Sequence, residues 1–599
     1  MVLQFNPLNK EQFTGGAINE SSALNVSVKT DLKALSLVLQ CDKDGKVAVY
    51  PMSWVDGCFT VSLLPLKVGL YFYYFESEGR LFGRDDFLNI KEYKSLKTLK
   101  KYQLSVYKKA YKTPDWLKGG IIYQIFPDRF CRGGGVSCKR PKMKKWGDLP
   151  DYLPNEKGKI TNDDFYGGNF NGIKSKLPYL KSLGVTAIYL NPVSKAFSNH
   201  RYDTADYLSL DEMLGTTSDF KALSNKAKSL GIEIIFDGVY NHTGDDSIYF
   251  NKYKTFNTVG AYNDKNSPYY NWYTFQNYPN KYTSWWGINV LPTINKDSVE
   301  FEDFIVNEVL NFYFSLGVKG VRLDVVDELP ARFTKKIRKA VKKLDNNAVI
   351  IGEVWEDATN KIAYGTRREY FLGEELDSVM NYPLKNALIS YALSGSEYEL
   401  TKIVCEQLNN YPKSTLPLLM NVLSTHDTPR ILTVLSGKPL PEKRCEQANF
   451  TISSLERELA VKRLKVISAL LFTLYGSPTI YYGDERGFEG GKDPFNRKCM
   501  TFTGGNLELL NHYKRLAKVR NASNALKLGN LEIITAKNGV FAFKRTYKGE
   551  SVTVITNMGN YVYNVNSKYK LKNLITGEVK TSFEIKKYSY LILGDTNAY

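Results

Sequence analysis

Residues 318–353 have the sequence VKGVRLDVVDELPARFTKKIRKAVKKLDNNAVIIGE, and this stretch decides the fold. Two short apolar runs, 318–324 and 348–353, flank residues 331–344, whose pattern is helical. Strand, helix and strand in this order predict a βαβ unit with two parallel strands. Each run ends in a carboxylate, Asp324 in the first and Glu353 in the second.

The same alternation continues from about residue 119 to 515. Helical patterns also cover 299–315 and 457–474, and the further candidate strands are IIYQIF (121–126), VTAIYL (185–190), IEIIFD (232–237), PLLMNVL (417–423) and PTIYYG (478–483). The number of strands is close to eight. A region of this length fits an α/β fold of the (β/α)8 TIM barrel type with insertions.

Two β-rich regions flank the barrel. Both alternate short β-like runs with turn signals, such as Asp56-Gly57 and Asn538-Gly539, which predicts a β-sandwich on each side. The expected domains are a carbohydrate-binding-like sandwich at 1–112, the barrel at 113–517 and a sandwich at 518–599. An insertion at 243–292, after the third strand, is rich in Tyr, Asn and Trp and is expected to form a lid.

The net charge of the chain is +19, from 81 Lys and Arg against 62 Asp and Glu. The excess is spread as single lysines and short patches, which indicates solvated surface and no nucleic-acid partner. Seven scattered cysteines favour a reducing compartment; Cys131 and Cys138 could pair, but two free thiols are the expectation. No signal-like or membrane-spanning segment is visible, so we expect no membrane association and a cytoplasmic location.

Carboxylates lie at or just after four predicted strands: Asp237, Asp324, Glu353 and Asp427. All strands of a (β/α)8 barrel open at their carboxyl ends onto one face, so these side chains are expected to converge. Crowded carboxylates repel one another, so folding does not favour the arrangement, whereas acid and base chemistry does.

Arg322 precedes Asp324 by two positions, and a strand places such residues on the same face. The guanidinium is therefore expected to keep Asp324 ionised, while Glu353 keeps a proton. Such a pair suits retaining glycoside hydrolysis, in which one carboxylate attacks and the other donates a proton. Of the four histidines, His242 and His426 lie beside acids just past strand ends and are expected to be functional, whereas His512 is expected to be structural.

These motifs resemble the α-amylase superfamily of glycoside hydrolases. Its short sequence regions match DGVYNH (237–242), GVRLDVVDE (320–328), GEVW (352–355) and STHD (424–427), in order and with the expected spacing. The resemblance implies that Asp324 is the nucleophile, Glu353 the acid/base and Asp427 a transition-state stabiliser. It further implies that Arg322, His242 and His426 contact the sugar in the −1 subsite, and that Asp237 organises the site from below.

Within the superfamily the likeness is strongest to the cyclomaltodextrinase, neopullulanase and maltogenic amylase group. It is carried by NHRYDTADY (199–207), SWWGINVLPTIN (284–295), HDTPR (426–430) and YYGDERGFEGGKDPFNR (481–497). This resemblance implies that Tyr202 stacks beneath the −1 glucose, that Asp493 and Arg497 bind sugars towards the non-reducing side, and that Trp355 lines the acceptor side. The N-terminal sandwich of this group often builds a dimer, so a homodimer is one alternative.

Some positions depart from the group. The loop CRGGGVSCKR (131–140) and Asn169 stand where relatives often carry calcium ligands, so no metal and no cofactor are expected, and a weak calcium site is the alternative. Thr293 replaces a usual Lys, which leaves the substrate preference open, and DGVYNHTGDDSIYFN is closer to amylopullulanase-type relatives. Trp285 and Trp286 either pack the lid or contact sugar.

The expected function is retaining hydrolysis of α-1,4 bonds in maltodextrins, cyclodextrins and pullulan, with transglycosylation left open. The partners would be α-1,4-glucan oligosaccharides. An α-amylase or amylopullulanase-type enzyme acting on starch is the alternative, and a non-catalytic carbohydrate-binding protein is a more remote one.

Overall fold

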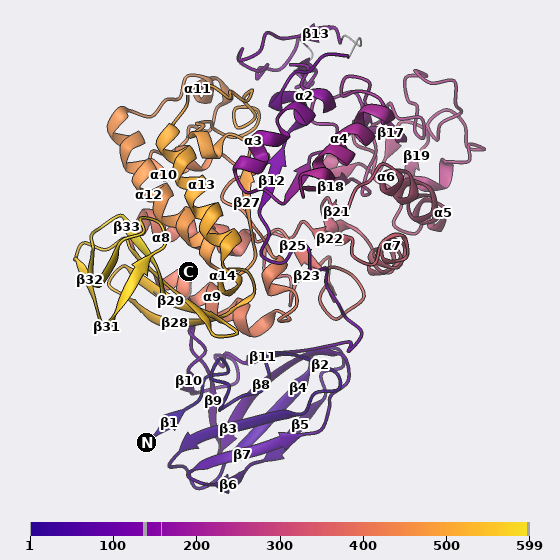
Figure 1. The fold of residues 1–599 in the computed structure, drawn as a ribbon. Helices are drawn as coiled ribbons and strands as arrows, with labels where there is room; N and C mark the ends of the chain where they lie inside the picture. The colour runs from indigo at the N-terminus through magenta and orange to yellow at the C-terminus, as the bar shows by residue number, and fades with distance from the viewer. Residues whose placement is uncertain (1, 136–139, 157, 596–599) are drawn as a thin grey trace.

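The computed structural model describes residues 2–135, 140–156 and 158–595 (Figure 1). An eight-stranded parallel barrel forms the middle of the chain, with antiparallel sheets at both ends, which confirms the expected fold class. In spatial order the barrel strands are β25 (Ser378–Val379), β22 (Val349–Gly352), β21 (Gly320–Leu323), β18 (Glu233–Gly238), β15 (Ala187–Leu190), β12 (Ile122–Ile125), β27 (Ser477–Tyr481) and β26 (Met420–Asn421).

The barrel closes between its two shortest strands. Met380 and Met420 form a parallel bridge, and the Asn381 N–H donates to the Met420 carbonyl at 2.8 Å. The sequence pattern had indicated seven of these strands and missed β25. Two residues are too few to show a period, so only the pairing with neighbouring strands defines this element.

Barrel strands are buried on both faces, because alternate side chains point into the barrel and towards the helices. On β15, Ala187 and Tyr189 pack inside the barrel, whereas Ile188 and Leu190 pack against the helical layer. The surrounding helices include α4 (Thr217–Ser229), α7 (Ala331–Leu344), α8 (Tyr382–Ser394), α9 (Tyr398–Asn410), α12 (Ser454–Thr473) and α13 (Leu507–Ala522).

Two of the three expected helices are single helices in the structure, α7 and α12. The third, at 299–315, consists of α5 (Val299–Phe304), a π-helical turn η3 (Ile305–Val309) and α6 (Leu310–Ser315). Ser453 caps α12 by accepting from the Glu456 N–H, and the Glu456 side chain accepts from the Ser453 N–H in return. This capping box satisfies donors that the first turn of a helix leaves free.

The N-terminal sheets pack face to face around a separate apolar core. One sheet contains β1 (Leu3–Gln4), β3 (Leu24–Thr30), β7 (Cys58–Leu63) and β6 (Ser53–Val55). The other contains β10 (Ile90–Tyr93), β9 (Arg80–Arg84), β8 (Gly69–Ser77), β11 (Tyr102–Tyr107), β2 (Ala17–Asn19), β4 (Ser36–Cys41) and β5 (Val47–Pro51). In Figure 1 these strands lie below the barrel.

The C-terminal sheet has six antiparallel strands: β28 (Asn530–Lys537), β29 (Val540–Tyr547), β30 (Glu550–Asn557), β33 (Ser589–Asp595), β31 (Tyr563–Asn573) and β32 (Val579–Ile585). Phe541 and Phe543 of β29 belong to the large core shared with the barrel helices, whereas Val540 and Ala542 pack on the opposite face. Because alternate side chains of a strand point to opposite faces, one face of this sheet packs against the barrel helices.

The insertion at 243–292 contains only short elements, η1 (Tyr270–Trp272), β19 (Phe275–Asn277), β20 (Lys281–Tyr282) and η2 (Trp285–Gly287). Aromatic rings hold it together; Phe250, for example, packs edge-on against Tyr282 at a centroid distance of 4.7 Å. No helix in the described part of the chain is long and apolar enough to cross a bilayer.

Candidate active site

Four carboxylates meet at the carboxyl end of the barrel. Asp237 lies in β18, and Asp324 and Glu353 directly follow β21 and β22. Asp427 lies in the loop after β26. The parallel register places Asp237 opposite Arg322, so the first three acids lie on adjacent strands. Asp237 and Asp427 are 190 positions apart in the sequence, and the structure brings them to the same end of the barrel.

A single guanidinium lies at the centre of this cluster. Arg322 Nη1 lies 2.8 Å from Asp237 Oδ1 and 2.8 Å from Asp324 Oδ1, while Nη2 lies 2.7 Å from Glu353 Oε2. The Arg322 side chain is completely buried. One buried cation is therefore shared by three carboxyl groups, and a single positive charge cannot balance three ionised acids.

The electrostatics of Asp324 differ from the expectation that Arg322 simply keeps it ionised. Burial raises the pKa of Asp324 well above its ordinary value. Arg322 lowers it, but the guanidinium is divided among three acids, and Glu353 and Asp237 raise the pKa further. The correction is that Asp324 holds a proton more tightly than an ordinary aspartate.

Asp427 is also perturbed. Burial and the negative charge of Glu353 raise its pKa to about 7, against the opposing effect of Arg497. Asp427 Oδ2 lies 3.2 Å from His426 Nε2, and Oδ1 lies 4.0 Å from Arg497 Nη2. Perturbed carboxylates of this kind are typical of catalytic sites.

The Glu353 carboxylate is oriented by donors on both oxygens. The Val325 N–H donates to Oε2 at 2.9 Å, and the Trp355 indole N–H donates to Oε1 at 3.1 Å. Trp355 in turn stacks on Tyr382 at a centroid distance of 3.8 Å. Trp355 is 43% exposed and lines the cavity, so its ring presents a flat apolar surface next to the acid.

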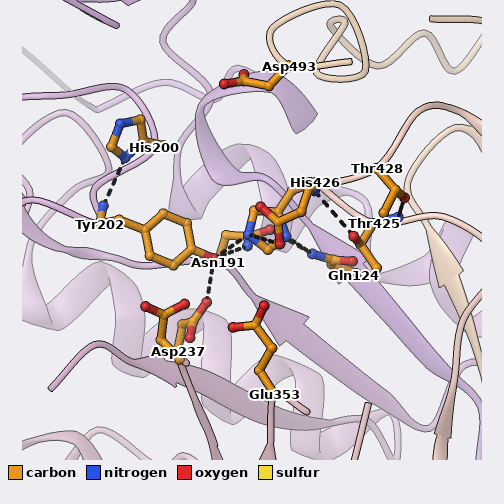
Figure 2. Close-up of polar contacts among 12 residues, drawn as sticks. Gln124, Asn191, His200, Tyr202, Asp237, Glu353, Thr425, His426, Thr428 and Asp493 are labelled. Carbon is orange, nitrogen blue, oxygen red and sulfur yellow. Dashed lines mark hydrogen bonds and ion pairs between the residues drawn. The ribbon is translucent and has the colours of Figure 1, made fainter. Parts of the chain in front are cut away.

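Tyr202 and His426 lie above the Asp237 and Glu353 carboxylates in the view of Figure 2. Their rings stack at a centroid distance of 5.3 Å with 5° between the planes. Gln124 Nε2 donates to His426 Nδ1 at 2.9 Å, so the proton of the neutral ring is on Nε2, which lies 2.5 Å from the Tyr202 hydroxyl. That hydroxyl donates to Asp237 Oδ2 at 2.8 Å. Burial holds the pKa of His426 well below its usual range, so the chain of donors involves a neutral imidazole.

His242 is held differently. Its ring stacks on Trp285 of the insertion at a centroid distance of 5.0 Å. Burial lowers the pKa of His242 to about 4. Its Nε2 atom is buried and has no hydrogen-bond partner among the described residues. Because His242 lines the cavity, this nitrogen is available to a polar group of a bound molecule.

These side chains surround a cavity of about 1180 Å³. Nine of the residues expected at the site line it: Tyr202, His242, Asp324, Glu353, Trp355, His426, Asp427, Asp493 and Arg497. Asp493 and Arg497 form an ion pair of 2.8 Å on one side. Arg322 and Asp237 do not line the cavity; Arg322 lies behind it and contacts Asp237, Asp324 and Glu353. The direct contact of Arg322 with sugar stays a prediction.

Sequence reasoning missed several residues that build the site. Tyr189 donates to Asp237 Oδ2 at 2.6 Å, and Asn191 donates to the Tyr202 hydroxyl at 2.9 Å. Gln124 could have been found, because a polar residue inside the apolar run IIYQIF has no packing role. Lys361 and Tyr364 also line the cavity, and no local pattern marked them.

The Asn169 side chain contacts the backbone of two nearby glycines. Asn169 Oδ1 accepts from the N–H groups of Gly172 and Gly133, so this side chain caps helix α2 (Phe170–Ser175). Among the described residues, no group of three or more His, Cys, Asp or Glu side chains is placed to hold a metal ion. The pairing of Cys131 with Cys138 lies outside the described residues.

Comparisons with known proteins agree with this architecture. The model of the alpha-amylase catalytic domain matches residues 124–504. An amylopullulanase from Thermoanaerobacter thermohydrosulfuricus is 38% identical in an alignment of 499 residues that covers 74% of this chain and 33% of that protein. A cyclomaltodextrinase from Thermoanaerobacter pseudethanolicus is 33% identical in an alignment of 470 residues that covers 75% of this chain and 72% of that protein.

Among solved structures, the type III pullulan hydrolase from Thermococcus kodakarensis superposes with a TM-score of 0.70 at 28% identity, covering 99% of this chain and all of that one. The chain spans about a third of the length of the amylopullulanases that it matches. The matched region includes seven of the barrel strands in full and the second half of β12, together with every residue of the carboxylate cluster. The chain therefore belongs to the alpha-amylase family of glycoside hydrolases.

Proposed function

We propose that the chain is a retaining hydrolase of α-1,4-glucosidic bonds in maltodextrins, cyclodextrins and pullulan. The observation that carries the proposal is the cluster of Asp324, Glu353 and Asp427 at the wall of one cavity, with Arg322 behind it. Two carboxylates on adjacent strands, held by neighbouring nitrogens of one guanidinium, suit a double-displacement reaction.

In the proposed reaction Asp324 attacks the anomeric carbon while Glu353 donates a proton to the leaving oxygen. The bond to the leaving sugar breaks and a glucosyl ester of Asp324 forms. Glu353 then takes a proton from water, whose oxygen attacks the same carbon and releases Asp324. A sugar hydroxyl in place of water would give transglycosylation.

The protonation state of Asp324 in this scheme depends on the charges around it. Binding of a sugar would displace water from the cavity, and attack by Asp324 requires its ionised form. Arg322 supports that form through the contact to Oδ1 at 2.8 Å. Asp427 would stabilise the positive charge that develops on the sugar ring, the neutral His426 would bind its hydroxyls, and Tyr202 would stack beneath the ring.

The substrate class is supported by the relatives and by the shape of the cavity. Proteins named cyclomaltodextrinase and neopullulanase 2 are 33% and 32% identical over 75% of this chain. Trp285, Trp286 and Trp355 all line the cavity, and indole faces suit the apolar faces of glucose rings.

A starch-cleaving, amylopullulanase-type activity is the second candidate. The observation in its favour is the 38% identity to an amylopullulanase, which exceeds the identity to the cyclomaltodextrinase. That relative is about three times longer than the matched region, so its additional parts have no counterpart in this comparison.

Product profiles separate the two candidates. The purified protein is incubated separately with β-cyclodextrin, pullulan, soluble starch and maltotriose, with Glu353→Gln as the inactive control, and products are resolved by chromatography. Rapid conversion of cyclodextrin and pullulan to maltose or panose, with slow attack on starch, is the expected outcome. Preference for starch would favour the second candidate, and no product from any substrate would contradict glucan hydrolysis.

A further inference from the structure

A small hairpin, β23 (Ile362–Ala363) and β24 (Thr366–Arg367), forms part of the cavity rim. Both residues of its turn have positive φ, 50° at Tyr364 and 75° at Gly365, as a two-residue type I′ turn requires. Glycine adopts this conformation freely, whereas tyrosine does so at an energetic cost. The Tyr364 ring is 67% exposed, so core packing does not compensate that cost. A strained aromatic residue at a cavity rim points to a functional role.

The hairpin is held by the N-terminal sandwich. An isolated two-stranded hairpin is marginally stable, but Arg367 forms a bidentate ion pair with Asp42, which directly follows β4. The distances are 2.7 Å from Nε to Oδ2 and 2.9 Å from Nη2 to Oδ1. Both side chains are less than a third exposed, so the pair is partly shielded from solvent. The Asp42 N–H donates to the Leu70 carbonyl at 2.9 Å, which fixes the acid on the sheet.

A second attachment holds the chain that leads into the hairpin. Gln103 on β11 donates through Nε2 to Thr359 Oγ1 at 2.9 Å, and its Oε1 accepts from Asn360 Nδ2 at 2.7 Å. The Arg367 guanidinium also donates to the Asn360 carbonyl. The segment 359–367 therefore begins and ends on the N-terminal sheet.

The hairpin contacts the segment that follows the proposed nucleophile, Asp324, in the sequence. The Tyr364 hydroxyl donates to Glu328, and Lys296 Nζ lies 4.6 Å from the centre of the Tyr364 ring. Lys361 Nζ lies 3.4 Å from Asp327 Oδ2. Both acids belong to η4 (Val326–Glu328), which begins two residues after Asp324. The hairpin thus connects the N-terminal sheet to the wall of the cavity.

We propose that Asp42 is a positioning residue: through its ion pair with Arg367 it holds the hairpin so that Tyr364 stays at the rim. The N-terminal sandwich would thereby set the affinity for long or cyclic glucans, which extend from the central acids to this rim. Short glucans that fill only the positions next to Asp324 and Glu353 would not depend on it. This inference rests on the proposed glucan hydrolysis and extends it to substrate size.

The test compares Asp42→Asn with Asp44→Asn, a matched control in the same turn. Asp44 pairs with its neighbour Lys46 and lies on the surface, so its loss changes the charge equally without releasing the hairpin. We expect Asp42→Asn to raise the KM for β-cyclodextrin about 5-fold with kcat nearly unchanged, and to leave maltotriose kinetics unchanged. A KM increase of equal size for both substrates, or none for cyclodextrin, would overturn the proposal.

Two further measurements keep the outcome interpretable. Combining Asp42→Arg with Arg367→Asp recreates the ion pair with reversed charges. Each single variant should raise the KM for β-cyclodextrin, and the double variant should return it to the wild-type value. Amide hydrogen exchange at 361–368 should be faster in Asp42→Asn than in the wild type and in Asp44→Asn, and equal exchange in all three would refute the anchoring. An inactive wild type would contradict the proposed function, while the exchange measurement would still decide on the anchor.

Discussion

Replacement of Asp324 by asparagine tests the central chemical assignment. Asparagine keeps the size of the side chain and an Oδ1 acceptor for Arg322 Nη1, now at 2.8 Å, but its amide cannot form the ester with the anomeric carbon. Loss of a nucleophile raises the barrier by about 5–8 kcal/mol, which corresponds to a factor of roughly 10⁴–10⁶ in turnover. We therefore expect kcat to fall by at least about 10⁴-fold on any glucan that the wild type cleaves.

The same variant should fold at least as stably as the wild type. Burial raises the pKa of Asp324 above its ordinary value of 3.8, so the folded state binds this proton more tightly than the unfolded chain. Below pH 3.8 the carboxyl is protonated in both states and contributes no difference, whereas at higher pH its ionisation destabilises the folded state. The Tm of Asp324→Asn should therefore equal or exceed that of the wild type at pH 7, with a gap that grows between pH 4 and pH 7.

A small anion distinguishes the role of Asp324 from that of Glu353. In Asp324→Gly, azide can enter the space of the lost carboxylate and attack an α-glucoside with a good leaving group, which gives the β-azide. In Glu353→Ala the ester of Asp324 still forms, and azide then displaces it with a second inversion, which gives the α-azide. Proton NMR of the products identifies the anomer in each case.

Three results would refute this reasoning separately. Near-normal turnover of Asp324→Asn would remove Asp324 from the role of nucleophile. An α-azide from Asp324→Gly would contradict attack on the side of this residue. A Tm lowered by more than about 5 °C at pH 7 would show that the contact with Arg322 outweighs the cost of burial.

Further predictions concern pH, the donor network and the attachment of the C-terminal sheet. Burial and the nearby Glu353 raise the pKa of Asp427 to about 7, and the charge of Asp493 contributes to this rise. Asp493→Asn should therefore move the acidic limb of the kcat/KM profile to lower pH. A shift of this limb to higher pH would contradict the assignment. Tyr202→Phe removes the hydroxyl that donates to a buried acid at 2.8 Å, so kcat/KM should fall about 10–100-fold while calorimetry shows little change in Tm; an unchanged kcat/KM would exclude a role for the hydroxyl. Arg545 of β29 is buried and donates to the Thr473 carbonyl of the barrel helix α12 and to the Gly529 carbonyl next to β28. Arg545→Met should therefore lower the free energy of unfolding by about 2–5 kcal/mol in urea titrations, and an unchanged midpoint would argue against this attachment.

The placement of the four acids followed from local pattern combined with one topological rule. Runs such as VKGVRLD and AVIIGE show their strand character in apolar composition and length, and parallel strands in a barrel open onto the same face. The convergence of Asp324 and Glu353 could therefore be predicted without coordinates. The helix at 331–344 was visible for the same reason, because its apolar residues recur with the helical period.

Features that depend on distant contacts had no such signal. The strand β25 has two residues, and only its pairing with β22 and the Met380 bridge makes it part of the barrel. The rim hairpin was also invisible, because its anchor Asp42 lies 325 positions from Arg367 and neither residue belongs to a motif.

The sequence by itself determined where the candidate carboxylates lie relative to the strands, because an apolar strand pattern and the carboxylate at its end are local features. Only the tertiary structure decided how charge is distributed among them. Arg322 precedes Asp324 in the sequence, yet in the folded protein its guanidinium is shared with Asp237 and Glu353. Burial and the sum of all neighbouring charges set the protonation of each acid, and these quantities exist only once distant strands lie side by side.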